Sequence, residues 1–230
     1  GGTDSPYAVV IQTTGKLVVA GHTTPFIGDS DFALARYNTN GSLDDGTAND
    51  SNSADKFGTG GKVFTDFDGF ADLAFDLALQ SDDKIVVVGD VGPESSYKRD
   101  LAVVRYNSNG ELDMSFGTEG KVTTDFGASD SGYALAIQGD GKIVAAGNTL
   151  IPSVNKDFAL ARFNSNGSLD DGTVNDSTPG DQFGTNGKVL TDFGGTNDDA
   201  MALAVQNDKI IVVGWTNQSS GFDFAVARYN

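Results

Sequence analysis

Short apolar segments recur along the whole chain and alternate with polar turns. They are rich in Val, Ile, Leu and aromatic residues and are bounded by Gly, Asn, Asp or Ser, which is typical of β-strands. No segment keeps the apolar period of a helix over three turns. The segments are YAVVIQ, FDLALQ, YALAIQ and MALAVQ (7–12, 75–80, 133–138, 201–206); KLVVAGHT, KIVVVGDV, KIVAAGNT and KIIVVGWT (16–23, 84–91, 142–149, 209–216); DFALARYN, DLAVVRYN, DFALARFN and DFAVARYN (31–38, 100–107, 157–164, 223–230); and GKVFTDF, GKVTTDF and GKVLTDF (61–67, 120–126, 187–193).

Tight turns join the first two segments of every repeat. TTGK, SDDK, GDGK and QNDK have the composition of hairpin turns, and NGS or NGE follows the first three segments of the RYN type. We therefore expect one repeat domain over 1–230, built from antiparallel meanders of four strands. The expected units are 1–68, 69–127, 128–195 and 196–230, and the last one lacks the GKVxTDF strand.

The central strands of each unit are apolar on both sides. A small sheet of this kind cannot shield both of its faces, so each sheet must lie between neighbours. Face-to-face packing of four-stranded meanders predicts an all-β fold of β-propeller type with about four tandem blades, either closed or open and incomplete. An open stack or solenoid of the same units is the alternative.

The motif DFALARYNTNGSLD, followed by FGTGGKVFTDF and LALQSDDKIVVVG, resembles the delta-60 repeat family of bacterial secreted and surface proteins. The resemblance extends over all four units. It implies a propeller-like fold, an extracellular or cell-surface location and no catalytic residues. The chain departs from the family pattern in acidic insertions in its first and third units.

Three explanations account for the missing fourth strand of the last unit. The chain is a piece of a longer array, or the ring closes with a three-stranded blade, or a neighbouring molecule supplies the strand to the exposed sheet edge. The start at Gly1 suggests a mature product or an excised piece. Alternation of long and short units suits a longer array or a filament.

The acidic insertions are LDDGTANDSNSADKFG at 43–58 and LDDGTVNDSTPGDQFG at 169–184, and the second unit has the short form LDMSFG at 112–117. Because the short form suffices for a blade, the insertions are expected to have another role. Oxygen-rich loops of Asp, Asn and Gly suit Ca²⁺, which takes 6–8 oxygen ligands. A plain solvated loop is one alternative, since the spacing does not match an EF-hand, and a contact with a partner is another. The predicted calcium ligands are Asp44, Asp45, Asn49, Asp50, Asp55, Asp170, Asp171, Asn175, Asp176 and Asp181.

The net charge of −17 disfavours nucleic acid and anionic membranes as partners. The absence of cysteine excludes disulfides, thiolate catalysis and cysteine-ligated metals. No apolar run is long enough to span a bilayer.

Arginine recurs once in every repeat, and aspartate recurs at the start of each third strand and in each TDF segment. A residue that every unit repeats usually belongs to the construction of the unit. We therefore expect an Arg–Asp bridge within or between blades.

The sequence predicts that the chain is not an enzyme. His22 is the single histidine and is expected to be a solvated side chain at a loop end, and no acidic pair is unique to one unit. The expected function is a structural or adhesive module of a bacterial surface or secreted protein, stabilised by calcium and assembling with itself or with other repeats. A glycan-binding lectin domain is the alternative, and a propeller hydrolase or lyase is a weaker one.

Overall fold

The computed structural model describes residues 2–25, 28–47, 50, 54–93, 98–151, 155–173, 176, 178, 180–218 and 221–230. Every regular element in these residues is a β-strand. No helix among them has the length and hydropathy that crossing a bilayer requires.

The first two blades are four-stranded antiparallel meanders in chain order. In each, the strand order within the sheet equals the order along the chain, as the repeat predicts. The first blade holds β1 (Gly2–Ile11), β2 (Leu17–Pro25), β3 (Asp31–Tyr37) and β4 (Lys62–Thr65). The second blade holds β5 (Ala71–Leu79), β6 (Ile85–Gly92), β7 (Asp100–Tyr106) and β8 (Lys121–Thr124).

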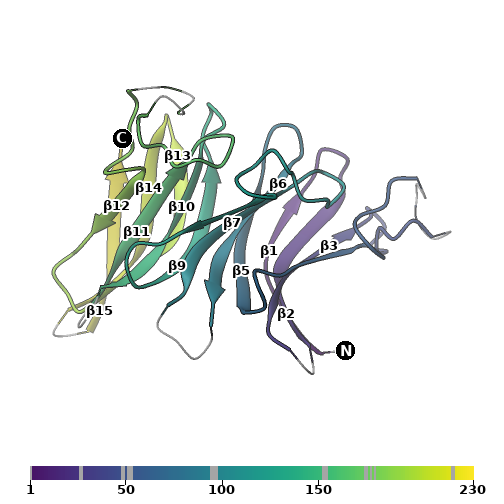
Figure 1. Ribbon diagram of the computed structural model, residues 1–230, viewed down its shortest axis with the longest axis horizontal. Helices are drawn as coiled ribbons and strands as arrows, with labels where there is room; N and C mark the ends of the chain where they lie inside the picture. The colour runs from purple at the N-terminus through teal and green to yellow at the C-terminus, as the bar shows by residue number, and fades with distance from the viewer. Residues whose placement is uncertain are drawn as a thin grey trace.

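The last seven strands form one hydrogen-bonded sheet that consists of two further meanders. A single parallel pair, Lys156 with Asn197, links them. The third blade holds β9 (Ser129–Ile137), β10 (Ile143–Ile151), β11 (Asn155–Phe163) and β12 (Lys188–Thr191). The fourth blade holds β13 (Asn197–Gln206), β14 (Lys209–Gln218) and β15 (Gly221–Tyr229). Figure 1 shows the blades side by side in chain order, with the first and the fourth at opposite ends.

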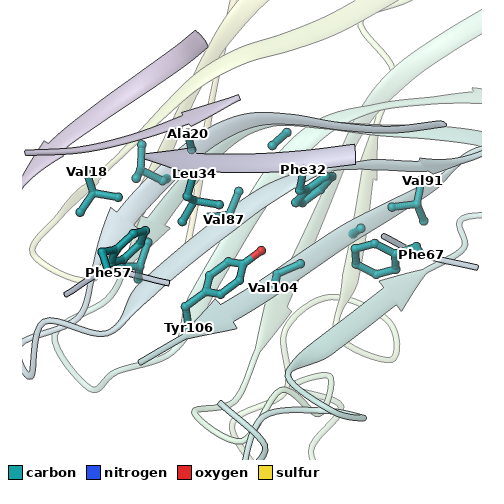
Figure 2. Packing of buried hydrophobic residues seen from close by; sticks show 14 residues of the cluster. Val18, Ala20, Phe32, Leu34, Phe57, Phe67, Val87, Val91, Val104 and Tyr106 are labelled. Carbon is teal, nitrogen blue, oxygen red and sulfur yellow. The ribbon is translucent and has the colours of Figure 1, made fainter. Parts of the chain in front are cut away.

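A hydrophobic core fills each of the three junctions between consecutive blades. Strand β6 contributes to two of them, because Val87 belongs to the core with the first blade while Val86 and Val88 belong to the core with the third. Figure 2 shows the first junction, where Phe32 and Leu34 of β3 face Val87 and Val104 of the second blade. Full burial of each such side chain contributes roughly 1.5–3 kcal/mol. The all-β propeller fold predicted from the sequence is confirmed.

A β-bulge interrupts the pairing of each first strand with its second strand. The residues left without a partner in the register are Tyr7, Phe75, Tyr133 and Met201. Opposite each bulge lies the repeated glycine of the second strand, Gly21, Gly89, Gly147 or Gly214. At Gly89 a Cβ atom would collide with the backbone carbonyl of Leu73, and the equivalent glycines meet the same obstacle. The bulge therefore requires a glycine on the strand opposite it.

Candidate functional site

The acidic insertion of the first blade closes over a network of ion pairs in which Lys16, Arg36 and Asp44 are buried and Asp55 is 40% exposed. Asp44 is fully buried and accepts hydrogen bonds from the Nε of Arg36 and, at 2.8 Å, from the Nζ of Lys16. Asp55, which the insertion adds, accepts from the same Lys16 at 2.9 Å and from the Nη2 of Arg36 at 2.8 Å. Two cations and two carboxylates thus alternate in one network.

The third blade repeats this network with Asp170, Asp181, Lys142 and Arg162. The Lys142 ammonium lies 3.0 Å from Asp170 and 2.9 Å from Asp181, and Arg162 binds both carboxylates. Burial lowers the pKa of Lys142, but the hydrogen bonds to the two carboxylates outweigh it, and the net pKa lies above its ordinary value. The ammonium is therefore held in its charged form.

The remaining insertion residues bind the backbone of their own loop. Asp45 accepts from the amide of Thr47 at 2.9 Å, and Asp50 accepts from the amide of Gly46 at 3.0 Å. Asp171 and Asp176 make the same contacts in the third blade. Asn49 and Asn175 lie outside the described residues. Of the predicted calcium ligands, the structure brings Asp44 and Asp55 together, and the cation between them is the ammonium of Lys16. Calcium binding by these loops remains a prediction.

The second blade shows what the insertion adds. Its short connection supplies Asp113, which lies 2.8 Å from Arg105 and 3.3 Å from Lys84. The place of the second carboxylate is taken by the Ser115 hydroxyl, which accepts from the Nη2 of Arg105. The side chain of Lys84 is 31% exposed, against 8% for Lys16 and 2% for Lys142. The long insertion therefore covers this lysine and adds a carboxylate that also binds the repeated arginine, whereas the second carboxylate of Lys84 is Asp82 of its own turn, at 3.4 Å.

The predicted Arg–Asp bridge exists, and it lies inside each of the first three blades. Its partner is the aspartate after the third strand, such as Asp44 for Arg36, and not Asp31 at the start of that strand. The guanidinium of Arg36 also donates to the carbonyl of Ser108 in the next blade at 2.7 Å and lies over the ring of Phe57. Arg36 therefore joins its own blade to the following one, and Arg105 does the same through the carbonyl of Ser165.

The recurring aspartates that do not pair with arginine lie close to one another in clusters of three. In each cluster three carboxylates, from the start of a third strand, the TDF segment and the start of the next blade, place one oxygen each within 4.8 Å of the others. We call these clusters the aspartate triads. They are Asp31, Asp66 and Asp72; Asp100, Asp125 and Asp130; and Asp157, Asp192 and Asp198.

The third member of each aspartate triad is buried. Asp72 and Asp130 are 0% exposed and Asp198 is 1% exposed. One oxygen of each accepts from the amide of the TDF phenylalanine, as Asp130 does from Phe126 at 2.6 Å. The other oxygen of each has no hydrogen-bond partner. Sequence reasoning missed these three residues, although each occupies the same position, eight residues before the glutamine of the first strand.

Burial is the main cause of the perturbed acidity in the aspartate triads. It raises the pKa of Asp72 to about 7 and that of Asp130 to about 6. Neighbouring carboxylates add to the effect, and the phenylalanine amides oppose it, together with the Thr149 hydroxyl at Asp130 and the charge of Arg99 near Asp72. The carboxyl groups of Asp72 and Asp130 therefore lie in surroundings that disfavour their charged form.

Three of the four bulge residues form an aromatic row across the first strands of the first three blades. The ring centroids of Tyr7 and Phe75 are 5.2 Å apart, as are those of Phe75 and Tyr133. His22 stacks on Tyr7 with a centroid distance of 5.4 Å. His22 is half-buried within β2, so the prediction of a solvated loop-end histidine is wrong: the strand extends past its VVAG core.

Large apolar side chains are exposed at both ends of the row of blades. At the C-terminal end Phe224 is 97% exposed and Val226 is 61% exposed. At the N-terminal end Val9 is 59% exposed and Ile11 is 66% exposed. We call these surfaces the C-terminal end face and the N-terminal end face.

The family model described as "domain of unknown function (DUF5122) beta-propeller" matches residues 12–46, 80–116, 138–172 and 206–230. These segments make up more than half of the chain and include part of each of the four blades. The chain belongs to the DUF5122 β-propeller family. The comparison with curated proteins gives no match.

Solved structures similar to this member of the family match it at low identity. One is a protein of unknown function from Bacteroides caccae, with 10% identity, a TM-score of 0.43 and 93% of this chain covered; this chain spans 57% of that protein. An exo-1,5-α-L-arabinanase from a bovine ruminal metagenomic library has 10% identity, a TM-score of 0.45 and coverage of 96% and 72% of the two chains. A β-fructofuranosidase of Bombyx mori has 15% identity, a TM-score of 0.47 and coverage of 99% and 49%.

The comparison contradicts the prediction that the chain is not an enzyme. Two of these three similar structures are enzymes. A single histidine and repeated acidic residues do not exclude catalysis in such a fold, because two carboxylates suffice for glycoside hydrolysis.

Proposed function

We propose that this propeller domain is an assembly module of a secreted or cell-surface protein, and that each end face binds a further unit of the same repeat. In solution the partner is a second copy of this chain. The resemblance to the delta-60 repeats of bacterial surface proteins supports the location, and the end faces support the mode of assembly.

One observation carries this proposal: Phe224 is exposed where its equivalents are buried. Phe32 and Phe158 occupy the same position in the first and third blades, and each is 0% exposed because the next blade packs on it. Val226 likewise corresponds to Leu34 and Leu160, which are almost fully buried. The C-terminal end face thus carries the kind of side chains that a blade contributes to a junction with the next blade.

The N-terminal end face carries the kind of side chains that a blade contributes to a junction with the preceding blade. Val9 is 59% exposed, whereas Leu77 and Leu135 at the same position are 5% and 7% exposed against the preceding blade. A groove on this face is lined by Val19, Ala33, Ala35, Tyr37 and Phe64, among others. In the second blade the equivalents of Val19 and Tyr37 are Val87 and Tyr106, and both are fully buried.

The two faces are different surfaces, so association is head to tail. Such an interface produces a ring when the rotation closes and a filament when it does not. The net charge of −17 opposes association at low ionic strength. Screening by salt is therefore expected to favour assembly.

Sedimentation velocity at increasing protein concentration and salt tests the proposal. Phe224→Asp and Val9→Asp each leave one end face intact, so each variant alone should stay monomeric. Mixing the two should restore a dimer and nothing larger, because only one compatible pair of faces remains. Met114→Asp, at a 66% exposed side chain away from both faces, is the control and should assemble like the wild type. A wild-type protein that stays monomeric at all concentrations would refute the proposal.

A second candidate function is glycan binding on the row of Tyr7, Phe75 and Tyr133. Three aromatic rings spaced by 5.2 Å along adjacent first strands offer apolar faces on which a sugar ring could stack. Asp90, on the strand next to Phe75, is bound to Arg99 and adds polar groups nearby. A glycan array with the wild type and Tyr133→Ala tests this candidate, and wild-type binding that the variant retains would place any glycan elsewhere.

A further inference from the structure

Each blade junction carries one aspartate triad, and the triad is built from both blades. In the first junction Asp31 begins β3, Asp66 follows β4, and Asp72 belongs to β5 of the next blade. The second and third junctions repeat this arrangement with the equivalent residues. Whatever binds a triad therefore binds two consecutive blades at once.

The described structure leaves the triad carboxylates without cationic partners. None of the ion pairs found among the described residues includes a triad member. Lys121 lies close to the first triad, yet its ammonium donates to the backbone carbonyl of Asp66 at 2.6 Å. Lys188 does the same with the carbonyl of Asp125 in the second triad.

The buried member of each triad points to a ligand. Asp72, Asp130 and Asp198 each keep one oxygen that accepts no hydrogen bond, at an exposure of at most 1%. A buried carboxylate oxygen without a partner is costly, and two further carboxylates within 4.8 Å increase the cost. A cation between the three groups would remove both costs.

We infer that each aspartate triad binds one divalent cation of the calcium class and that the ion clamps consecutive blades together. Three carboxylates supply part of the 6–8 oxygen ligands that Ca²⁺ takes. Water can supply the rest, because Asp66, Asp125 and Asp192 are exposed. The flexible coordination of Ca²⁺ suits carboxylates from three separate strands better than the strict octahedron of Mg²⁺ does.

The two ends of the chain provide natural controls. Asp4 is the equivalent of Asp72 in the first blade, but no blade precedes it in this structure; it is exposed and accepts from the hydroxyl of Thr23 at 2.6 Å. Asp223 is the equivalent of Asp31 in the fourth blade and is exposed. Neither belongs to an aspartate triad, so replacing either one should leave cation binding unchanged.

Calorimetric titration of the metal-free chain with Ca²⁺, with Mg²⁺ as comparison, tests the inference. We expect three Ca²⁺ per chain, one for each aspartate triad. Saturation of one site at 100 times its Kd should raise Tm by roughly 5–10 °C, and a chelator should reverse the shift. Asp72→Asn should remove one ion, and the triple variant with Asp130→Asn and Asp198→Asn should remove all three.

The asparagine variants also separate binding from a merely structural role. Asparagine keeps an oxygen for the phenylalanine amide and removes one negative charge. Without Ca²⁺ the triple variant should therefore melt at the same temperature as the wild type or higher, while its response to Ca²⁺ is lost. Asp4→Asn should keep the full response.

Two outcomes would overturn the inference. One is a triple variant that binds as much Ca²⁺ as the wild type; loss of binding in Asp45→Asn with Asp171→Asn would then assign the ions to the acidic insertions. The other is a wild type that neither binds Ca²⁺ nor gains stability from it. These measurements are made on the monomer, so their result does not depend on assembly through the end faces.

Discussion

The hydroxyl of Tyr106 lies 2.7 Å from the hydroxyl of Thr65, and this hydrogen bond joins the second blade to the first inside their shared core. Tyr229 makes the same bond to Thr191 between the fourth and third blades. At the middle junction the tyrosine is replaced by Phe163, and the hydroxyl of Thr124 is buried without a hydrogen-bond partner.

Phe163→Tyr should therefore stabilise the protein. The new hydroxyl would reach Thr124, as Tyr106 reaches Thr65, and would satisfy a buried polar atom at a gain of about 1 kcal/mol. Urea unfolding measures the difference. The reverse change, Tyr106→Phe, should lower the free energy of unfolding by a similar amount. If Phe163→Tyr destabilises the protein, the middle junction has no room for the hydroxyl.

Phe32→Ala and Phe224→Ala should have very different effects, although both residues hold the same repeat position. Phe32 is fully buried at a blade junction, and its truncation should cost roughly 3–5 kcal/mol. Phe224 is 97% exposed, so its truncation in the monomer should change stability by less than about 0.5 kcal/mol. Thermal unfolding at low protein concentration compares them, and equal losses would show that the C-terminal end face is covered.

Gly89→Ala should lower stability by about 1–3 kcal/mol, because the methyl group would collide with the carbonyl of Leu73 opposite the bulge at Phe75. Gly139→Ala is the matched control, since a Cβ there meets only the side chain of Asp208 at 3.8 Å. Chemical denaturation of both variants checks the expectation. A tolerated Gly89→Ala would mean that the first strand can move away from the second.

Asp113 should contribute stability that is lost in acid. Burial raises its pKa, but hydrogen bonds from Ser115 and the charges of Arg105 and Lys84 outweigh burial and lower the pKa to about 2. Because the folded pKa lies below the unfolded value, the contribution is complete above about pH 4 and disappears as the pH falls toward 2. The shift corresponds to about 2 kcal/mol.

Unfolding of the wild type and of Asp113→Asn between pH 2 and 7 measures this contribution. The two stability curves should be separated at neutral pH and converge in acid. Parallel curves would show that the folded protein does not depress the pKa of Asp113.

Much of the fold could be predicted because its signals are local. Repeated β-branched segments, the Asn-Gly turns and strands that are apolar on both sides lead to stacked meanders, and β6 shows this with Val87 and Val88 in different cores. The bulges were not foreseen, because the extra residue, such as Phe75, looks like any other apolar strand residue.

The candidate sites depended on contacts between distant residues. The insertions are rich in oxygen, and this suggested calcium, yet Lys16 and Arg36 from neighbouring strands reach Asp44 and Asp55. The aspartate triads combine residues from separate parts of two blades, so the fixed spacing of Asp72, Asp130 and Asp198 before a glutamine marks a repeated position without showing which carboxylates it meets. The prediction against catalysis relied on the absence of motifs, and such an absence does not exclude catalysis.

The position of a blade in the row also sets how easily it opens. The second and third blades are enclosed by a neighbour on each side, whereas the first and fourth have a neighbour on one side only. Backbone amides of β6 and β10 should consequently exchange with solvent deuterium only when most of the molecule opens, while those of β1 and β15 exchange by local fraying. Loss of structure should thus begin at the two outer blades and advance inward, and a partner bound at either end would delay it.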